Sequence, residues 1–438
     1  MTKNIGIGLL GLGTVGTGVA QIINSPEGRH PLTSRVELKR IALRDSKKIR
    51  ALSIPNKLIT EDAWEVVEDP DVEIVVEVIG GLEPARSLIL KAIKSGKSVV
   101  TANKAVIARH GEEIAEAAIS SGVYVLIEAA VGGGIPIIEP LKQSLGGNII
   151  QKVTGIVNGT TNYILTRMAK EGADYEAVLK EAQSLGYAES DPMADVEGLD
   201  AADKISILSN LAFGGPIKRA SVPTKGISTL QNRDVDYANQ LGYEVKLLAI
   251  AERLASNLEN NSSLPLAVRV EPTLLPTGHP LAEVNGVNNA ILVEGDPIGE
   301  VMFYGPGAGA GPTASAVVAD ILNIAGIKLM GGEKTSLDPL LSASSWRECH
   351  LAKPKEILQK NYVRLIAKDA PGVIGQIGKI FGSHNVSIQS IVQFDASEED
   401  AEIVVITHKV FKGLLTDSLS EIQQLPEIKQ IAAHLSCL

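Results

Sequence analysis

The sequence predicts an α/β fold in which a helix-covered parallel sheet is followed by an α+β region and by a compact C-terminal unit. Over residues 5–128, short apolar runs of strand type alternate with runs of helical period, which indicates a parallel sheet with helices on both faces. This alternation stops after Gly132-Gly133-Gly134. From Tyr362 onward, six runs follow in the order βαββαβ, the ferredoxin-like plan.

The first region is expected to hold five strands and three main helices. Its strands are predicted at Ile5–Leu10, Val36–Leu43, Asp71–Ile79, Ser98–Thr101 and Tyr124–Glu128. Its helices are predicted at Val15–Ile23, Pro84–Ser95 and His110–Ser121.

The second and third regions follow from the same periodicities. In the second, helices are predicted at Pro136–Leu145, Thr160–Lys170, Tyr175–Leu185 and Ala201–Phe213, with strands at Lys152–Val157, Glu244–Glu252, Leu266–Val270 and Ala290–Val293. A glycine-rich run, Tyr304–Gly311, then leads into a helix at Pro312–Ile324. The C-terminal elements are predicted at Tyr362–Ala367, Gly372–Phe381, Val386–Phe394, Glu402–His408, Leu414–Gln424 and Lys429–His434.

The domain boundaries are expected where these patterns change. We expect a dinucleotide-binding domain over 1–134, with the helix in 305–330 packing back on it, and a catalytic and dimerisation domain over 135–304. A polar linker, 331–355, would precede the C-terminal domain, 356–438.

Composition excludes several classes of protein. A net charge of −10 argues against a general nucleic-acid partner or an anionic membrane surface. The two cysteines, Cys349 and Cys437, are too few for a disulfide framework and fit a reducing cytoplasm. We expect no targeting segment and no apolar run of membrane-spanning length.

A glycine motif of the type GxGxxG follows the first strand and opens the first helix. Its residues are Gly11, Leu12, Gly13, Thr14, Val15 and Gly16. The first glycine permits a tight turn, the second lets the backbone approach a pyrophosphate, and the third lets the helix pack on the strand. This context predicts a Rossmann-type dinucleotide site; the alternative is a glycine-rich turn that binds no ligand.

The end of the second strand bears on the choice of cofactor. Arg44, with Lys47 and Lys48 nearby, suits the 2′-phosphate of NADP, whereas Asp45 suits the ribose hydroxyl of NAD. We favour NADP and keep NAD open. At least one of the two lysines is expected to lie in a solvated turn.

Lys204 lies within the apolar stripe of the helix predicted at Ala201–Phe213. At about 100° per residue, Asp200 lies one turn before it, and Asp203, Ser206, Ser209 and Asn210 are expected on the opposite, polar face. Burial disfavours the charged amine, which favours a role in proton transfer. The alternatives are a snorkelling lysine and a structural Lys–Asp pair.

Three further segments carry chemical groups. The loop Leu185–Asp200 holds five carboxylates, which suit a substrate ammonium, a cation or simply solvent. Lys104 follows the strand Ser98–Thr101 at the edge of the sheet where ligands bind, unless it is an ordinary helix-start lysine. The glycines after Glu128 give a backbone able to turn its carbonyls toward a cation or cofactor, or a hinge.

Together these segments resemble homoserine dehydrogenase in its form with a C-terminal ACT regulatory domain. The matching stretches are Gly11–Gly16, Thr101–Ala105, Glu128–Pro136, Asn158–Asn162, Leu185–Lys204, Tyr304–Thr313 and Asp369–Val373. The resemblance implies interconversion of L-homoserine and L-aspartate 4-semialdehyde with NAD(P), in threonine, methionine and isoleucine biosynthesis.

The resemblance also implies roles for individual residues. Lys204 looks like the proton donor and acceptor, and Lys104 like the lysine near the nicotinamide. The implied substrate-binding acids are Glu189, Asp195 and Asp200; the implied cofactor contacts include Gly186 and Gly305; and the implied sodium site is Glu128, Val131, Gly133 and Ile135.

In the C-terminal unit, Asp369, Pro371 and Gly372 form the turn at which ACT domains bind small amino acids. We hypothesise L-threonine as the effector and a homodimer or homotetramer as the assembly; a module used only for assembly is the alternative.

Two other functions compete with this interpretation. An acylating aspartate-semialdehyde dehydrogenase needs a cysteine beside a base, and neither Cys349 nor Cys437 is placed for that role. A non-enzymatic sensor of nucleotide and amino acid would leave Lys204 and the acidic loop unexplained.

Overall fold

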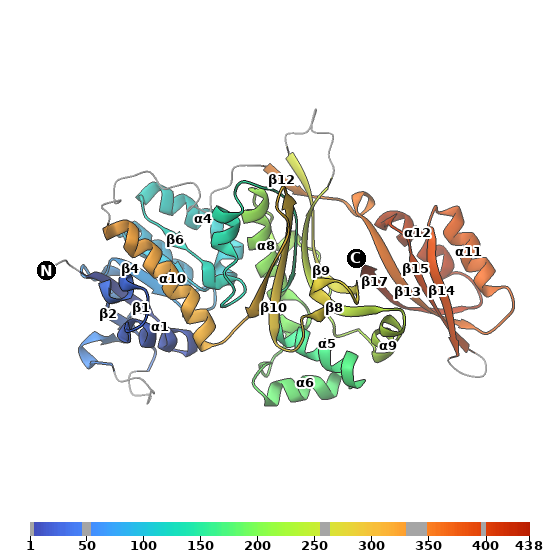
Figure 1. Cartoon of the computed structure of the whole chain (residues 1–438), viewed down its shortest axis with the longest axis horizontal. Helices are drawn as coiled ribbons and strands as arrows, with labels where there is room; N and C mark the ends of the chain where they lie inside the picture. The colour runs from blue at the N-terminus through green and yellow to red at the C-terminus, as the bar shows by residue number, and fades with distance from the viewer. Residues whose placement is uncertain (1–3, 46–53, 255–262, 330–347, 396–399) are drawn as a thin grey trace. The chain divides into compact units, whose positions relative to one another are not determined.

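The computed structural model describes residues 4–45, 54–254, 263–329, 348–395 and 400–438. The chain forms two compact units (Figure 1). The first unit comprises Met1–Val153, Asp203–Ser221 and Asn289–Cys349, and the second comprises Thr154–Ala202, Val222–Asn288 and His350–Leu438. Lys47 and Lys48 lie outside the described residues.

A six-stranded parallel sheet forms the centre of the first unit. Its strands are β1 (Ile5–Leu10), β2 (Val36–Ala42), β3 (Ile59–Thr60), β4 (Ile74–Glu77), β5 (Ser98–Thr101) and β6 (Val125–Leu126). They lie in the order β3-β2-β1-β4-β5-β6, with every neighbouring pair parallel. This is the order of dinucleotide-binding sheets, so the predicted α/β fold is confirmed.

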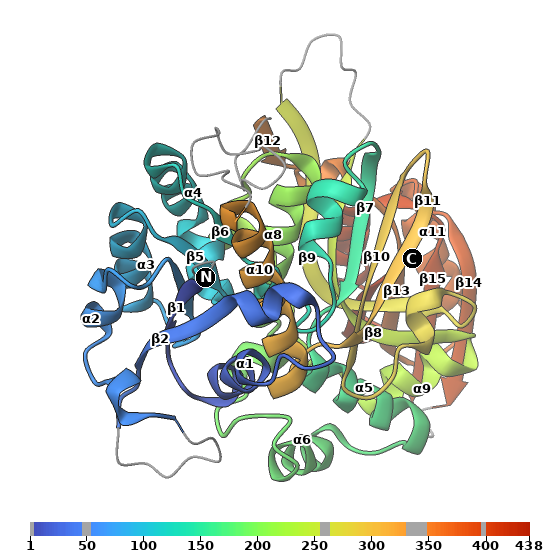
Figure 2. The same cartoon turned by 60° about the vertical axis from the view of Figure 1, so that its left-hand side comes forward.

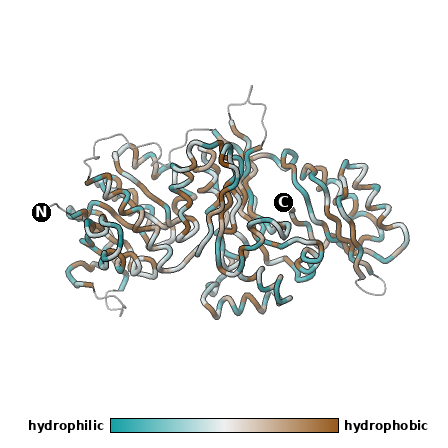
Figure 3. The backbone as a smooth tube through the Cα atoms, viewed as in Figure 1, coloured by the Kyte–Doolittle hydropathy of each residue, from teal (hydrophilic) through white to brown (hydrophobic). Residues whose placement is uncertain are grey.

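Helices cover both faces of this sheet, and its central strands β1 and β4 are buried along their whole length. One face packs against α1 (Thr14–Asn24) and α10 (Ala310–Leu329), which lie side by side in Figures 1 and 2. The other face packs against α2 (Ala63–Glu68), α3 (Ala85–Lys94) and α4 (Lys104–Ser121). Figure 3 shows hydrophobic stretches of the backbone both in the strands and in helices such as α10.

The expectation that no apolar run reaches membrane-spanning length is wrong for α10. This helix is long and apolar enough to cross a membrane, by length and composition only. Half of it is buried, and Val317, Ile321 and Ile324 lie in the same core as the strands β1 and β2. Its hydrophobicity is therefore explained by packing against the sheet.

The remaining elements of the catalytic region divide between the units. β7 (Ile149–Ile156) leads from the first unit into the second, and β10 (Asn288–Asp296) and β11 (Gly299–Pro306) return to the first. The second unit holds α5 (Gly159–Glu171), α6 (Tyr175–Ser184), α7 (Met193–Val196), α9 (Asn232–Gln240), β8 (Tyr243–Arg253) and β9 (Ser263–Pro276). The helix α8 (Leu199–Phe213) begins in the second unit and continues in the first.

The C-terminal residues form the predicted βαββαβ unit. Its elements are β13 (Leu358–Lys368), α11 (Val373–Ser383), β14 (Ile388–Asp395), β15 (Asp400–Thr407), the short β16 (Val410–Phe411), α12 (Lys412–Ile422) and β17 (Ile428–Cys437). Both helices share one core with β13 and β15. The strand β17 also pairs in parallel with β9, through Ser436 and Thr273, so the C-terminal sheet continues the sheet of β8 and β9. No pattern in the sequence predicted this junction.

Local predictions differ from the structure at several places. The helix expected over Pro136–Leu145 is reduced to a π-helical turn at Pro140–Ser144, because proline lacks the N–H that a regular helix needs. The helix α4 starts six residues earlier than expected, at Lys104, where Asn103 caps it. Part of the expected linker forms a strand, β12 (Glu348–Leu351).

Within the second unit, a buried ionic network joins the C-terminal βαββαβ elements to α9. Arg364 of β13 is 1% exposed; its Nε donates to Asp234 Oδ1 at 2.7 Å and its Nη1 donates to Glu402 Oε2 at 3.1 Å. A third donor, Nη2, reaches Gln231 Oε1 at 2.7 Å. The guanidinium is therefore fully engaged, and Asp234 depends on it for charge compensation.

We predict that Arg364→Met strongly destabilises the fold, since it leaves Asp234 buried without its counter-ion and leaves Glu402 with Arg233 alone. Breaking a buried pair in this way costs about 3–5 kcal/mol. Thermal or urea unfolding measures the loss, with Lys409→Met, at an exposed position of the same unit, as the control. An Arg364→Met protein as stable as the control would contradict this account.

Candidate active site

The glycine loop after β1 is shaped to receive an anion. Gly11 has φ 101°, and a side chain there would meet Val78 O at 2.9 Å. A side chain at Gly16 would meet Gly11 O at 2.1 Å, so the loop and the start of α1 can pack this closely only as glycine. Gly13 and Thr14 are exposed, and nothing lies within 4 Å of a Cβ placed at Gly13. The N-terminus of α1 thus offers open backbone N–H groups for a pyrophosphate.

Arg44 and Asp45 directly follow β2 beside this loop. Gly11 N donates to Ala42 O at 3.0 Å, which brings the end of β2 next to the first glycine. Both Arg44 and Asp45 are exposed. The position suits recognition of the cofactor's ribose, by either the cation or the carboxylate.

A buried carboxylate, Glu77, organises the next two loops at the same edge of the sheet. It is 0% exposed at the end of β4, and its Oε1 accepts hydrogen bonds from Ile79 N at 2.8 Å and Gly80 N at 3.2 Å. Its Oε2 accepts from Thr101 Oγ1 at 2.6 Å, at the end of β5. Glu77 was predicted only as part of a strand, so its role was missed; an acid three residues before Gly80-Gly81 was the available signal.

Lys104 is the first residue of α4 and follows the end of β5, which Glu77 holds through Thr101. Thr101 Oγ1 in turn accepts from Asn103 N at 3.0 Å, and Asn103 Nδ2 donates to Gly81 O at 2.7 Å. Lys104 is half-buried and lies in the first turn of α4. The amine is therefore carried by a backbone held at both ends, at the carboxyl edge of the sheet where ligands bind.

In the second unit, Asn158 brings two of the predicted acids together. Its Nδ2 donates to Asp195 Oδ1 at 2.7 Å and to Asp200 Oδ2 at 3.0 Å, while its Oδ1 caps α5 by accepting from Thr161 N. Thr160 Oγ1 also reaches Asp195 Oδ2, at 3.3 Å. We call Asn158, Thr160, Asp195 and Asp200 the acidic group. Two carboxylates held this closely suit an ammonium group.

Glu189 and Gly186 lie in the loop after α6. Among the described residues, Glu189 is exposed and makes no hydrogen bond to the acidic group. Gly186 is exposed with φ 76°. Gly305 lies in β11 of the first unit, and a Cβ there would be 3.4 Å from Ile135 Cγ1.

Lys204 is buried, with 8% of its surface exposed, and lies one turn after Asp200 on α8. The polar face that was predicted opposite the apolar stripe is itself buried at Asp203, Ser206 and Ser209, which are 6%, 4% and 0% exposed. Asp203 accepts from Arg219 Nε at 2.7 Å and from Arg109 Nη1 at 3.1 Å. The helix is therefore buried on both sides, and its polar side is neutralised by arginines distant in sequence.

The turn that follows β6 forms a tightly curled backbone. Gly132 and Gly133 have φ 75° and 59°, and a Cβ at Gly133 would lie 2.4 Å from Gly307 O. Across the described residues, no backbone hydrogen bond outside helices and strands ends on the carbonyls of Val131, Gly133 or Ile135. Three carbonyl oxygens thus remain available to a cation.

The carboxylate of Glu128 holds this turn in place. It accepts from the backbone N–H groups of Ile137, Ile138 and Glu139 at 2.6, 2.9 and 2.7 Å. Burial raises the pKa of Glu128, and these three donors oppose that shift. The backbone N–H groups of this segment therefore supply the hydrogen bonds that water would give to an exposed Glu128 carboxylate.

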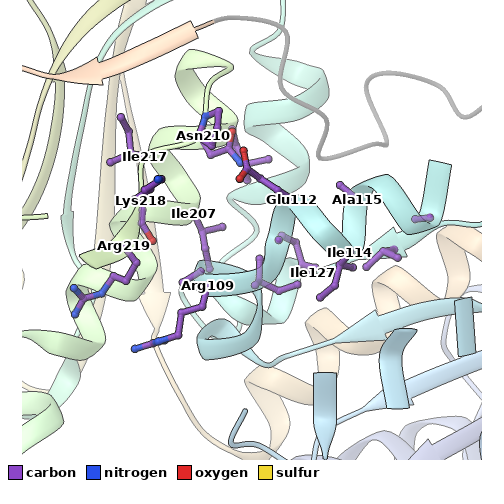
Figure 4. Close-up of a pocket in the computed structure, with 18 of the residues that line it drawn as sticks. Arg109, Glu112, Ile114, Ala115, Ile127, Ile207, Asn210, Ile217, Lys218 and Arg219 are labelled. Atoms are coloured by element: carbon purple, nitrogen blue, oxygen red, sulfur yellow. The ribbon is translucent and has the colours of Figure 1, made fainter. Parts of the chain in front are cut away.

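A cavity of about 370 Å³ opens between α4, β6 and α8 in the first unit (Figure 4). Its lining includes Ser206, Ile207, Asn210 and Leu211 of α8. Figure 4 shows Arg109 and Arg219 extending to one side, away from Ile114 and Ile127. Lys204 itself does not belong to the lining of this cavity.

Comparison with protein families shows three matches along the chain. A family described as "Homoserine dehydrogenase, NAD binding domain" matches residues 11–128, and one described as "Homoserine dehydrogenase" matches residues 136–322. The ACT domain family matches residues 361–427.

Individual proteins match over nearly their full length. A homoserine dehydrogenase of Synechocystis is 55% identical over 99% of both chains, and that of Bacillus subtilis is 40% identical over 98% of this chain and 97% of its own. The crystal structure of a homoserine dehydrogenase from Thiobacillus denitrificans matches with a TM-score of 0.89 at 40% identity, covering 100% of this chain and 98% of that one.

We predict that Glu77→Ala weakens binding of the nicotinamide cofactor by at least about tenfold. The change removes the carboxylate that accepts hydrogen bonds from Ile79 N, Gly80 N and the Thr101 hydroxyl. Each buried donor left unsatisfied costs about 1–3 kcal/mol, and part of that cost would destabilise the loop conformation that binds the cofactor. Fluorescence titration with NADPH measures the dissociation constant, with Glu116→Ala, at an exposed position of α4, as the control. Equal affinities in two folded variants would exclude this role for Glu77.

Proposed function

The chain belongs to the homoserine dehydrogenase family of NAD(P)-dependent oxidoreductases, and we propose that Lys204 is the acid–base group of its reaction. The observation that carries this proposal is the burial of Lys204 on α8, one turn after Asp200, whose carboxylate Asn158 holds in the acidic group. A lysine kept from water can exchange a proton at neutral pH more readily than an exposed one.

In the oxidising direction, the hydroxyl of L-homoserine loses its proton while its carbon gives up a hydride. The nicotinamide supplies the hydride acceptor when the cofactor is bound. Neutral Lys204 would take the hydroxyl proton, and in reduction the protonated amine would return it to the developing alkoxide. The product of oxidation is L-aspartate 4-semialdehyde, and the proton and hydride balance.

The carboxylates would bind the substrate rather than react with it. We assign the ammonium of the amino acid to Asp195, Asp200 and the more exposed Glu189. A cation bound there would reduce the electrostatic repulsion between carboxylates that lie close together. Lys104 would polarise the reacting oxygen or hold the substrate carboxylate, because the N-terminus of α4 adds positive potential there.

Arg44 supports NADP as the preferred cofactor. It is an exposed guanidinium at the end of β2, where the ribose of a dinucleotide is recognised. A hyperthermophilic archaeal homoserine dehydrogenase, 29% identical over 74% of this chain with a TM-score of 0.60, is known in complex with NADPH. Asp45 would serve NAD, so the ratio of the two activities depends on which side chain engages the ribose. We assign Gly186 and Gly305 to contacts with this cofactor.

The turn at Glu128 fits a sodium ion. The free carbonyls of Val131, Gly133 and Ile135, with the backbone of Glu128, supply the neutral oxygen ligands that a monovalent cation accepts. When bound, sodium would hold this turn rather than take part in proton or hydride transfer.

The competing dehydrogenase chemistry lacks its nucleophile. Cys437 is 3% exposed, and burial raises the pKa of its thiol to about 12, which disfavours the thiolate. The thiol of Cys349 donates to Phe213 O at 3.7 Å.

The turn before α11 supports an effector role for the ACT domain. Asp369, Pro371 and Gly372 are exposed, Gly372 has φ 91°, and a Cβ there would meet nothing within 4 Å. Space, a carboxylate and a helix N-terminus are what a free amino acid requires. We propose L-threonine as inhibitor, bound in a homodimer or homotetramer.

Lys204→Met is expected to lower kcat by about 10²–10⁴, the usual contribution of a positioned acid–base group. Binding of NADPH, measured by fluorescence, is expected to stay within about twofold of wild type, because the amine serves proton transfer. Turnover is followed at the nicotinamide absorbance, with Lys180→Met, at an exposed position of α6, as the control. Wild-type turnover in Lys204→Met would end the assignment.

Asp369→Asn is expected to raise the threonine concentration needed for inhibition by about 10–100-fold while leaving kcat unchanged. A charge-assisted hydrogen bond of about 1.5–3 kcal/mol to the effector's ammonium would be lost. Asp417→Asn, at an exposed position of α12, is the control. If the wild-type enzyme ignores threonine, the effector assignment fails and the module serves assembly.

A further inference from the structure

Three carboxylates meet inside the first unit, away from the predicted catalytic lysines in sequence. They belong to Glu128 in the turn after β6, Glu139 before the π-helical turn and Asp320 on α10. One carboxylate oxygen of each lies within 4.8 Å of the other two. Glu128 is 4% exposed and Asp320 0%, and Glu139 is half-buried.

The acidic cluster retains unused acceptor positions. Asp320 Oδ2 accepts from Glu128 N at 2.8 Å, but in the part of the chain that the structure describes, Asp320 Oδ1 has no hydrogen-bond partner. A carboxylate offers about four acceptor positions, and three of those on Glu128 are taken by backbone N–H groups. An oxygen left unsatisfied in a fully buried carboxyl group needs a ligand, because burial without one is costly.

The charges in the cluster do not balance. The side chain of Lys142 brings one cation to the cluster, with its Nζ 3.4 Å from Glu139 Oε1. Three ionised carboxylates and one ammonium leave a formal charge of −2.

We propose that Glu128, Glu139 and Asp320 form a binding site for one hard divalent cation of the calcium or magnesium class. Such ions take carboxylate oxygens at about 2.0–2.6 Å, so oxygens on opposite sides of one ion are about 4–5 Å apart. The observed limit of 4.8 Å fits that range. A divalent ion would also supply the missing partner of Asp320 and the two missing positive charges.

This site differs from the sodium site proposed above in its ligands. That site uses neutral backbone carbonyls, whereas this one uses charged carboxylates, two of which, on Glu139 and Asp320, take no part in it. The two share only the residue Glu128, through different atoms. The proposal goes beyond the dehydrogenase activity and does not depend on it.

The test is calcium and magnesium binding to the full-length protein after dialysis against EDTA, by calorimetry and by the shift in melting temperature. Each titration is run at constant sodium and again in choline. Glu139→Gln and Asp320→Asn remove one ligand charge each, and Glu116→Gln, at an exposed position of α4, is the control. Glu139 is only half-buried, so Glu139→Gln is expected to fold and tests the site even if Asp320→Asn does not fold.

We expect one divalent ion per chain in the wild type and in Glu116→Gln, at least a tenfold weaker affinity in Glu139→Gln, and no dependence on sodium beyond ionic strength. No binding to the wild type would overturn the proposal. So would equal affinities in Glu139→Gln and the control, or full competition by sodium, which would place a single ion at the carbonyls.

Discussion

A carboxylate can remain inside a protein only where hydrogen-bond donors or a cation replace its water, and the edge of the first unit is built on that constraint. Glu77 satisfies it with Ile79 N, Gly80 N and the Thr101 hydroxyl. Glu128 satisfies it with three backbone donors of one loop. In both cases the donors include backbone N–H groups of a loop, Ile79 and Gly80 for Glu77 and Ile137 for Glu128, so the carboxylate helps to hold that loop in place.

The same constraint explains the position of the lysines. In the proposed reaction, the amine of Lys104 needs a defined backbone near the cofactor, and the Glu77–Thr101–Asn103 hydrogen bonds provide it. In the same proposal Lys204 needs a site away from water. The helix α8 keeps Lys204 buried, and its opposite side is buried as well, with Asp203 paired to Arg109 and Arg219. If the polar side of α8 were exposed, water would reach that side of the helix, and the helix would be less firmly held.

The sequence predicted what local pattern controls. The strand Ile5–Leu10 has the predicted bounds because an apolar run meets glycine at its end, and the burial of Lys204 agrees with its place in an apolar stripe. Helical periodicity alone could not show that Asp203 is buried, because Arg109, its partner, is 94 residues away. The role of Glu77 and the pairing of β17 with β9 likewise depend on contacts between distant segments, which spacing in the sequence does not encode.

The pairing of β17 with β9 changes how the ACT domain can communicate. A module tied by a flexible linker could bind an effector without altering anything else in the chain. Here Ser436 and Thr273 share a parallel ladder, and Arg364 ties β13 to Asp234 on α9. The helix α9 in turn bonds to α5, since Asn239 Nδ2 donates to Ala169 O at 3.2 Å. The N-cap of α5 is Asn158, which donates hydrogen bonds to Asp195 and Asp200. A movement of the C-terminal sheet would therefore be transmitted to the acidic group through packed and hydrogen-bonded elements of the second unit.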